Sequence, residues 1–304
     1  MSRKSKLGLV LAASLVTVLA AYAGQAYAGG VRVISDRAVM GFAYPESVAY
    51  DPNANALYVS EFGSALKPTL KDGQGRISKL SLDGKMLEER FLPAAGQTLN
   101  KPKGIWVSGD RLWVTDIDSV WVFDTGTKEG RNVALPGVQF ANDPTVIGNT
   151  LYVSDNRGDQ LYSVEPADFL NMAGEPDVTL VWSGKEINPN GVAPAADGSL
   201  LMVGFGAKET PRGIHVMAPG GEPEALSDGI GRLDGVYQMS DGALLITDWN
   251  SGSLGLWSAE GGMQELASDF KGPADFGVAP NAEGLLVAVP DLVKSELRLI
   301  QLGQ

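Results

Sequence analysis

The sequence predicts an all-β fold, a six-bladed β-propeller of four-stranded antiparallel blades, and three observations lead to it. A polar opening, an apolar strand, a turn rich in Gly, Asp and Asn, and a second apolar strand recur six times along the chain. A third apolar strand follows each of the first five copies. The copies are spaced by about 45 residues, the length of a propeller blade. A β-sandwich or barrel would not predict six similar openings, and a seven- or eight-bladed ring would need a longer chain.

The N-terminal residues 1–28 predict a signal peptide. Three basic residues open the segment, residues 7–21 form an almost continuous apolar run, and Ala26-Tyr27-Ala28 has the small-x-small pattern of a signal-peptidase site. A retained N-terminal anchor is the alternative, although the run is shorter than the roughly 20 residues of a spanning helix. We therefore expect a periplasmic or secreted protein whose propeller domain spans residues 29–304, with no membrane contact after cleavage.

The six copies share one register, set by their second strands. They begin at Pro45, Pro102, Ala141, Pro189, Leu233 and Ala274, and their second strands align at Leu57, Leu112, Leu151, Leu200, Leu244 and Leu285. Third strands are expected over 76–82, 120–123, 160–164, 213–217 and 254–257. An extra strand over 31–34 beside 296–301 would close the ring and hide two sheet edges. Residues 63–75 interrupt the first blade and predict a surface loop over one face, which could act as a lid.

Composition excludes several classes of site and partner. The net charge of −12 repels nucleic acid and anionic lipid, and it is compatible with a cation ligand. The absence of cysteine excludes disulfides, thiolate metal sites and a cysteine nucleophile. The one histidine, His215, lies in a strand pattern away from the repeat openings, which favours a structural role over a catalytic one.

The openings of successive blades converge on the central channel of a propeller, so residues in register there face one space. These positions are Glu46, Lys103, Asn142, Asn190, Asp234 and Asp275. Amide and carboxylate oxygens with almost no nitrogen or sulfur donor suit a hard cation, with Ca²⁺ preferred because it accepts several oxygens in flexible geometry. The alternative for each residue taken singly is a turn, because Asn-Gly and Asp-Gly are ordinary turn dipeptides. Asp155 and Asp248 end second strands, where an acid closing a turn is favoured over a second ion site.

Several short motifs in this order give the chain a family resemblance over essentially all of residues 29–304. They are Pro45-Glu46, Phe140-Ala-Asn142-Asp143, Asn190-Gly191, Asp234-Gly235, Asp241-Gly-Ala-Leu-Leu and Phe276-Gly277. The chain resembles the senescence-marker-protein/gluconolactonase-like (regucalcin-like) six-bladed propellers, which are similar in site design to calcium-dependent phosphotriesterases and paraoxonases.

The resemblance implies a divalent cation, Ca²⁺ or another, bound by Glu46, Asn142, Asn190 and Asp234. It also implies that the metal polarises a lactone or ester carbonyl, or a phosphoryl oxygen, while a carboxylate activates water or attacks directly. Asp234 is the first candidate for that carboxylate and Asp143 the second.

Two positions depart from the family pattern, Lys103 and Asp275. Lys103 could pair with Glu46 or Asp275 and weaken metal binding, or it could hold an anionic substrate. The arginine with which gluconolactonases grip a sugar acid has no assigned counterpart.

Three function classes follow from this sequence. The first is an exported calcium-dependent hydrolase acting on a lactone or ester, with a small-molecule substrate. The second is a non-catalytic NHL-like binding propeller with a structural ion or none. The third is a strictosidine synthase-like condensing enzyme, for which no clear signature is present. No protein partner is indicated.

Overall fold

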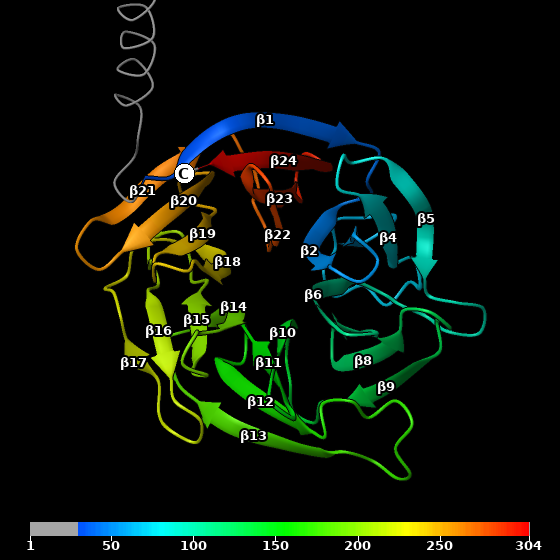
Figure 1. Cartoon of the computed structure of the whole chain (residues 1–304). Coiled ribbons are helices and arrows are strands. Elements are labelled where there is room, and N and C mark those ends of the chain that lie inside the picture. Colours follow the sequence, from blue (N-terminus) through cyan, green and yellow to red (C-terminus); the bar gives the residue numbers. More distant parts are fainter. Residues whose placement is uncertain (1–29, 304) are drawn as a thin grey trace, which may run out of the picture.

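The computed structural model describes residues 30–303, and the predicted signal peptide lies outside them. These residues form 24 strands in six four-stranded antiparallel sheets, with no helix. The sheets are arranged as blades around a central channel, and the first strand of each blade lies innermost (Figure 1). The predicted six-bladed propeller is therefore confirmed. Within residues 30–303 no helix could span a membrane.

Blades 1 to 5 run from the channel outward in chain order, as the repeat predicts. The first three blades are β2 (Pro45–Asp51), β3 (Ala56–Glu61), β4 (Arg76–Ser81) and β5 (Met86–Leu92); β6 (Pro102–Ser108), β7 (Arg111–Asp116), β8 (Ser119–Asp124) and β9 (Gly130–Ala134); and β10 (Ala141–Ile147), β11 (Thr150–Asp155), β12 (Gln160–Glu165) and β13 (Asp177–Ser183). The next two are β14 (Pro189–Pro194), β15 (Leu200–Gly204), β16 (Ile214–Met217) and β17 (Glu224–Ala225); and β18 (Leu233–Gln238), β19 (Leu244–Asp248), β20 (Ser253–Ser258) and β21 (Gly262–Ala267).

The sixth blade joins the two ends of the domain. It consists of β22 (Gly277–Asn281), β23 (Gly284–Asp291), β24 (Glu296–Gly303) and, as its outermost strand, β1 (Arg32–Met40). β1 pairs antiparallel with β24 from Arg32 opposite Gly303 to Met40 opposite Glu296. The expected ring closure is confirmed, and its N-terminal strand extends beyond the predicted residues 31–34. Pairing both termini in one sheet removes an exposed edge from that blade.

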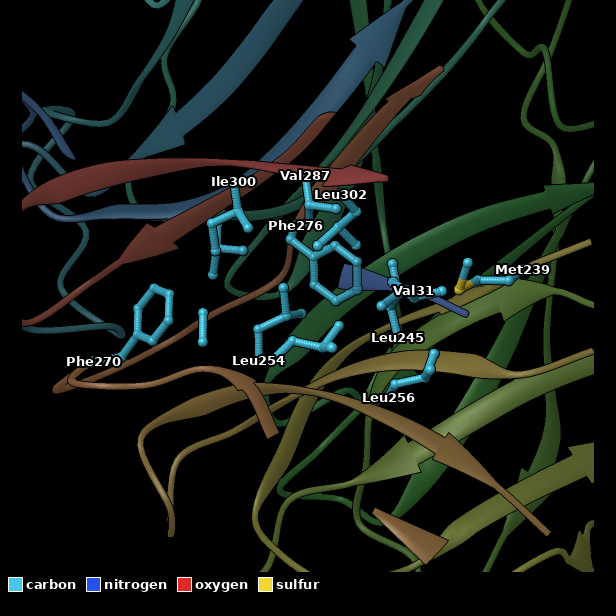
Figure 2. Packing of buried hydrophobic residues seen from close by; sticks show 13 residues of the cluster. Val31, Met239, Leu245, Leu254, Leu256, Phe270, Phe276, Val287, Ile300 and Leu302 are labelled. Atoms are coloured by element: carbon cyan, nitrogen blue, oxygen red, sulfur yellow. The ribbon is translucent and has the colours of Figure 1, made fainter. Parts of the chain in front are cut away.

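Apolar side chains pack between neighbouring blades. Figure 2 shows the cluster between blades 5 and 6, where Leu254 and Leu256 of β20 gather with Val287 of β23 and Ile300 and Leu302 of β24. All five are at most 5% exposed. Burying one such side chain stabilises the fold by about 1.5–3 kcal/mol. Because every blade contributes to two such clusters, the position of the innermost strands depends on the whole ring.

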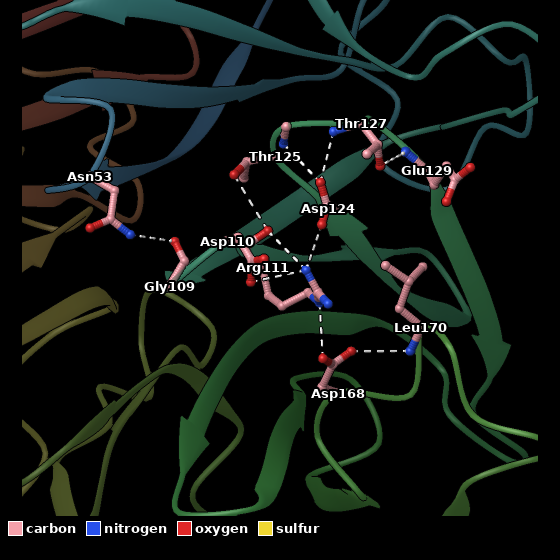
Figure 3. Close-up of polar contacts among 11 residues, drawn as sticks. Asn53, Gly109, Asp110, Arg111, Asp124, Thr125, Thr127, Glu129, Asp168 and Leu170 are labelled. Atoms are coloured by element: carbon pink, nitrogen blue, oxygen red, sulfur yellow. Dashed lines mark hydrogen bonds and ion pairs between the residues drawn. The ribbon is translucent and has the colours of Figure 1, made fainter.

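Polar contacts link the turns of blades 1 to 3 at the ends of the innermost strands (Figure 3). Arg111 of β7 bonds Asp124 in its own blade at 2.7 Å and Asp168 of blade 3 at 2.9 Å. The Asn53 side-chain amide donates to the Gly109 carbonyl at 2.9 Å, which joins blade 1 to blade 2. These contacts fix the relative positions of adjacent hairpins.

An aspartate ends the second strand in four blades and orders the turn that leads into the innermost strand. Asp116 accepts the backbone N–H groups of Asn100 and Lys101 at 2.7 and 2.8 Å. Asp155 accepts those of Gln139 and Phe140. Asp248 and Asp291 make equivalent bonds. Asp155 and Asp248 therefore close turns, as expected from the sequence.

Candidate functional site

The four predicted cation ligands line one cavity of 340 Å³ at the start of the innermost strands. Glu46, Asn142, Asn190 and Asp234 each occupy the second position of their strand, in β2, β10, β14 and β18. All four are only 5–6% exposed. The alignment of repeats predicted that these four side chains would face one space, and the cavity brings them together.

An irregularity in strand pairing directs these side chains toward the channel. The register between the first and second strands shifts around each one, between Pro45 and Ser47, Ala141 and Pro144, Pro189 and Val192, and Leu233 and Val236. A residue left out of the ladder bends its strand and re-aims the side chain. The polar opening of each repeat is therefore a local break in the sheet.

Buried hydroxyl groups link the starts of neighbouring innermost strands. Ser154 of β11 donates to the Asn190 carbonyl of the next blade at 2.6 Å, and the Thr115 hydroxyl donates to the Asn142 carbonyl in the same way. The Thr247 hydroxyl donates to the Ala274 carbonyl at 3.0 Å. The backbones that carry two of the candidate ligands are thus fixed by the preceding blade.

Glu46 is a buried carboxylate with an unused oxygen. Its Oε2 has no hydrogen-bond partner. Burial raises the pKa of Glu46 well above its usual range, the neighbouring Asp234 raises it further, and Lys103 opposes the rise. A buried acceptor without a partner is costly, so this oxygen points to a missing donor or cation.

Asp234 is held in place by an aromatic side chain. Trp249 Nε1 donates to its Oδ2 at 2.8 Å. Burial, and then the charge of Asp275, raise the pKa of Asp234 to about 8, against the bonds from Trp249 and Asn190. The carboxylate is therefore oriented, and it accepts a proton readily near neutral pH when no cation is nearby.

Lys103 lies in the same ring, at the second position of β6, and is fully buried. Its Nζ has no hydrogen-bond partner and lies 4.2 Å from the centre of the Phe140 ring. Burial lowers the pKa of Lys103 to about 8, while Glu46 opposes the shift. The sequence suggests two roles for Lys103, and one of them is an ion pair with Glu46 or Asp275. Within residues 30–303 Lys103 forms no such close ion pair.

Asp275 lies one position further along its blade than the sequence alignment placed it. Pro273 bridges Asp291, as Pro45 pairs with Glu61, so Ala274 is the counterpart of Glu46. The alignment was wrong here because blade 6 opens without regular strand: β22 begins only at Gly277.

Asp143 and Asp275 form a second, deeper tier of the channel. Both line a cavity of 210 Å³ that is further along the innermost strands and contains none of the four candidate ligands. Asp143 accepts the Val192 N–H at 2.8 Å, and Asp275 accepts the Ser47 hydroxyl at 2.5 Å. Burial raises the pKa of both, and the charge of Asp275 raises that of Asp143 further.

The wall of the 340 Å³ cavity contains residues that the sequence analysis did not single out. Part of the lining is apolar, with Phe62, Leu66, Pro68, Leu292 and Val293, and the lining also includes Phe140, Arg157, Phe205, Arg232 and Trp249. Arg232 directly precedes β18, and Arg157 lies in the turn between β11 and β12. Their position at the same end of the blades as the polar openings was the available signal.

The loop over residues 63–75 contributes Leu66 and Pro68 to this wall. Its base is fixed by Lys101, which is fully buried and donates to the Phe62 carbonyl at 2.7 Å and to Asp72 at 2.9 Å. Gly73 N–H donates to the Asn100 side chain. The loop therefore forms a wall anchored at both ends, which extends the prediction of a surface loop.

Within residues 30–303 no cluster of three or more His, Asp and Glu side chains could hold a metal alone. A cation site here therefore depends on the two amides beside Glu46 and Asp234. The donor set fits a hard cation, because all four residues offer oxygen and Glu46 Oε2 is otherwise unused.

Solved structures of other proteins share this fold. One is a protein assigned as a gluconolactonase, 15% identical, with a TM-score of 0.65 over 91% of this chain and 94% of that chain. Another is virginiamycin B lyase from Staphylococcus aureus, 12% identical, with a TM-score of 0.61 over 88% of this chain and 99% of that chain. No protein-family model and no curated protein matches the chain. At these identities the likeness shows the propeller fold alone, and the assignment of one neighbour as a gluconolactonase agrees with the resemblance stated above.

Proposed function

We propose that this protein is an exported, calcium-dependent hydrolase of a lactone or ester. The observation that carries the proposal is the cavity in which Glu46, Asn142, Asn190 and Asp234 converge, with a buried Glu46 oxygen that has no partner. Glu46 Oε2, Asp234 and the two side-chain amide oxygens would hold the ion. When bound, the cation would polarise a carbonyl oxygen as a Lewis acid.

Asp234 is the proposed base. Trp249 orients its carboxylate, and a bound cation would favour the ionised form of Asp234, which could then accept a proton from water. In the overall hydrolysis, the hydroxyl of water joins the acyl carbon, the bond from that carbon to the leaving oxygen breaks, and this oxygen takes the proton. Asp143 is a weaker candidate, because it lines the deeper cavity and its Oδ2 accepts the Val192 N–H.

Two further parts of the proposal rest on the sequence. The basic and apolar segment in residues 1–28 supports export to the periplasm or medium. The acidic charge disfavours nucleic acid, and the cavity of 340 Å³ suits a small-molecule substrate. His215, the one histidine, lies on β16 and lines neither channel cavity.

The test is calcium binding by calorimetry together with hydrolysis of γ-valerolactone, an aryl acetate and a phosphotriester, each with and without chelator. We expect about one bound Ca²⁺ and loss of turnover on chelation. Asp234→Asn keeps an oxygen ligand but removes the base, so turnover should fall by about 100-fold or more while some calcium binding remains. Asp177→Asn on the exposed face of β13 is the matched control. A protein that binds no calcium and hydrolyses nothing in the panel would instead be an NHL-like binding propeller.

A further inference from the structure

Two arginines line the cavity wall, and the charge of one of them, Arg232, opposes the rise in the pKa of Asp234. Arg157 and Arg232 both line the 340 Å³ cavity, and within residues 30–303 neither forms an ion pair. In contrast, Arg76, Arg111 and Arg298 each pair with carboxylates. Within residues 30–303, Arg37, Arg90 and Arg212 also form no ion pair, so the feature that sets Arg157 and Arg232 apart is that both line the same cavity.

Aromatic rings fix both guanidinium groups. The Arg157 group lies 4.2 Å from the centre of the Phe140 ring, and the Arg232 group lies 4.3 Å from Phe205 and 5.9 Å from Trp249. Arg232 Nε donates to the Gly206 carbonyl at 3.1 Å, which leaves its terminal nitrogens available. A guanidinium stacked by its face presents its N–H edge, and that edge matches a carboxylate with two parallel hydrogen bonds.

The two arginines offset the acidic residues of the cavity lining. Glu46 and Asp234 are the two acidic residues that line it, and Arg157 and Arg232 balance them. Lys103 adds a buried positive group beside Glu46. If a divalent cation is bound as proposed above, the lining becomes strongly positive.

Part of the cavity wall is apolar. Leu66 and Val293 are 40% and 44% exposed there, beside the buried Phe62 and Leu292. Exposed apolar side chains in a cavity wall favour an apolar ligand face. A carboxylate fits better than a dianionic phosphate in this setting, because a second charge adds to the desolvation cost.

We propose that Arg157 and Arg232 form a carboxylate subsite in the wall of the channel cavity, and that the ligand is a small amphipathic acid. Arg232, which is half-buried, is the principal anchor, and the exposed Arg157 completes the subsite at the rim. The part of this inference that names the substrate as a lactone or ester with a free carboxylate rests on the proposed function.

The binding test does not require hydrolysis. Calorimetry on the Ca²⁺-equilibrated protein would compare cyclopentanecarboxylate with cyclopentanemethanol, in wild type, Arg157→Gln and Arg232→Gln. Arg90→Gln, on an exposed position of the outer strand β5, is the matched control. We expect the carboxylate to bind in preference to the alcohol, and Arg232→Gln to weaken its binding by about 10- to 100-fold, the loss of a charged hydrogen-bond pair. The carboxylate subsite would be overturned if cyclopentanecarboxylate bound wild type and both variants with equal affinity. It would also be overturned if wild type bound cyclopentyl phosphate more tightly than cyclopentanecarboxylate.

The kinetic test uses a matched pair of lactones, 5-oxotetrahydrofuran-2-carboxylate and γ-valerolactone, which differ in a carboxylate and a methyl group. We expect Arg232→Gln to raise KM for the first by about 10-fold or more and to leave the second unchanged. An equal effect on both lactones would show a merely structural role and overturn the proposal. If no lactone is hydrolysed by wild type, the hydrolase proposal fails, and the calorimetric comparison still decides the subsite.

Discussion

At the residue scale, Lys103 is the feature that most affects whether the ring holds a cation. Its ammonium is buried without a hydrogen-bond partner beside Glu46, and its charge opposes that of an incoming metal ion. Two unit charges a few ångströms apart interact by about 1–4 kcal/mol at the effective dielectric constants of protein sites. The lysine therefore lowers the cation affinity that the four oxygen ligands would otherwise provide.

Replacing this ammonium tests that statement. Lys103→Met keeps the length and the contact with Phe140 but removes the charge, so Ca²⁺ should bind about 10-fold more tightly at pH 7, measured by calorimetry. Lys79→Met, which removes a lysine 5.4 Å from the ring of Tyr58 in blade 1, is the control and should leave the affinity unchanged. Weaker calcium binding by Lys103→Met would show that the lysine supports the site instead.

The sequence located four members of the channel ring but not all of its surroundings. Glu46, Asn142, Asn190 and Asp234 could be found because each follows the first residue of a strand whose partner strand was recognisable. Arg157 and Arg232 could not, because a side chain in a turn reaches the cavity only through the path of that turn. The predicted register of Asp275 was wrong by one position, because the opening of blade 6 is irregular.

At the element scale, the innermost strands approach so closely that a glycine is required after a candidate ligand. A Cβ on Gly191 would lie 2.0 Å from the Asp234 carbonyl oxygen, which belongs to the backbone of the next blade. A methyl group there must push β14 and β18 apart. The Asn190-Gly191 pair is thus an adaptation to the channel as well as a turn-like dipeptide.

Gly191→Ala should therefore destabilise the propeller by about 1–3 kcal/mol, the usual cost of overpacking. Gly126→Ala is the control, because a Cβ there meets nothing closer than the Asp124 carboxylate at 3.4 Å. Both are compared with wild type by urea unfolding. A Gly191→Ala protein as stable as the control would contradict the close packing of blades 4 and 5.

At the scale of the whole molecule, the repeat made the fold predictable. Six copies with three or four strands each leave few other all-β arrangements, and the closure of the ring by the N-terminal strand follows from the need to cover two edges. The cavity volume and the residues in its walls could not be predicted, because they depend on loops such as residues 63–75, whose anchoring by Lys101 and Asp72 involves contacts distant in sequence.

The channel also gives the whole molecule a pH dependence. Burial raises the pKa of Asp275 to about 7 and that of Asp234 to about 8, whereas an aspartate in the unfolded chain titrates near about 4. Between these values the folded protein holds protons that the unfolded chain releases, so a rise in pH favours unfolding. The stability from these groups is complete below pH 4 and is lost as pH rises to about 8.

This loss should be measurable as a fall in Tm between pH 5 and 8 in chelator, after comparison with Asp275→Asn. The variant keeps a polar side chain beside Ser47 but cannot ionise, so its Tm should fall less steeply over that range, whereas Asp177→Asn on exposed β13 should behave as wild type. Calcium should flatten the wild-type curve further if it binds beside Asp234, because a bound cation stabilises the ionised carboxylate. Parallel Tm curves for wild type and Asp275→Asn would mean that Asp275 is already ionised in the folded protein. The two acids of the deeper tier would then require a counter-charge of their own.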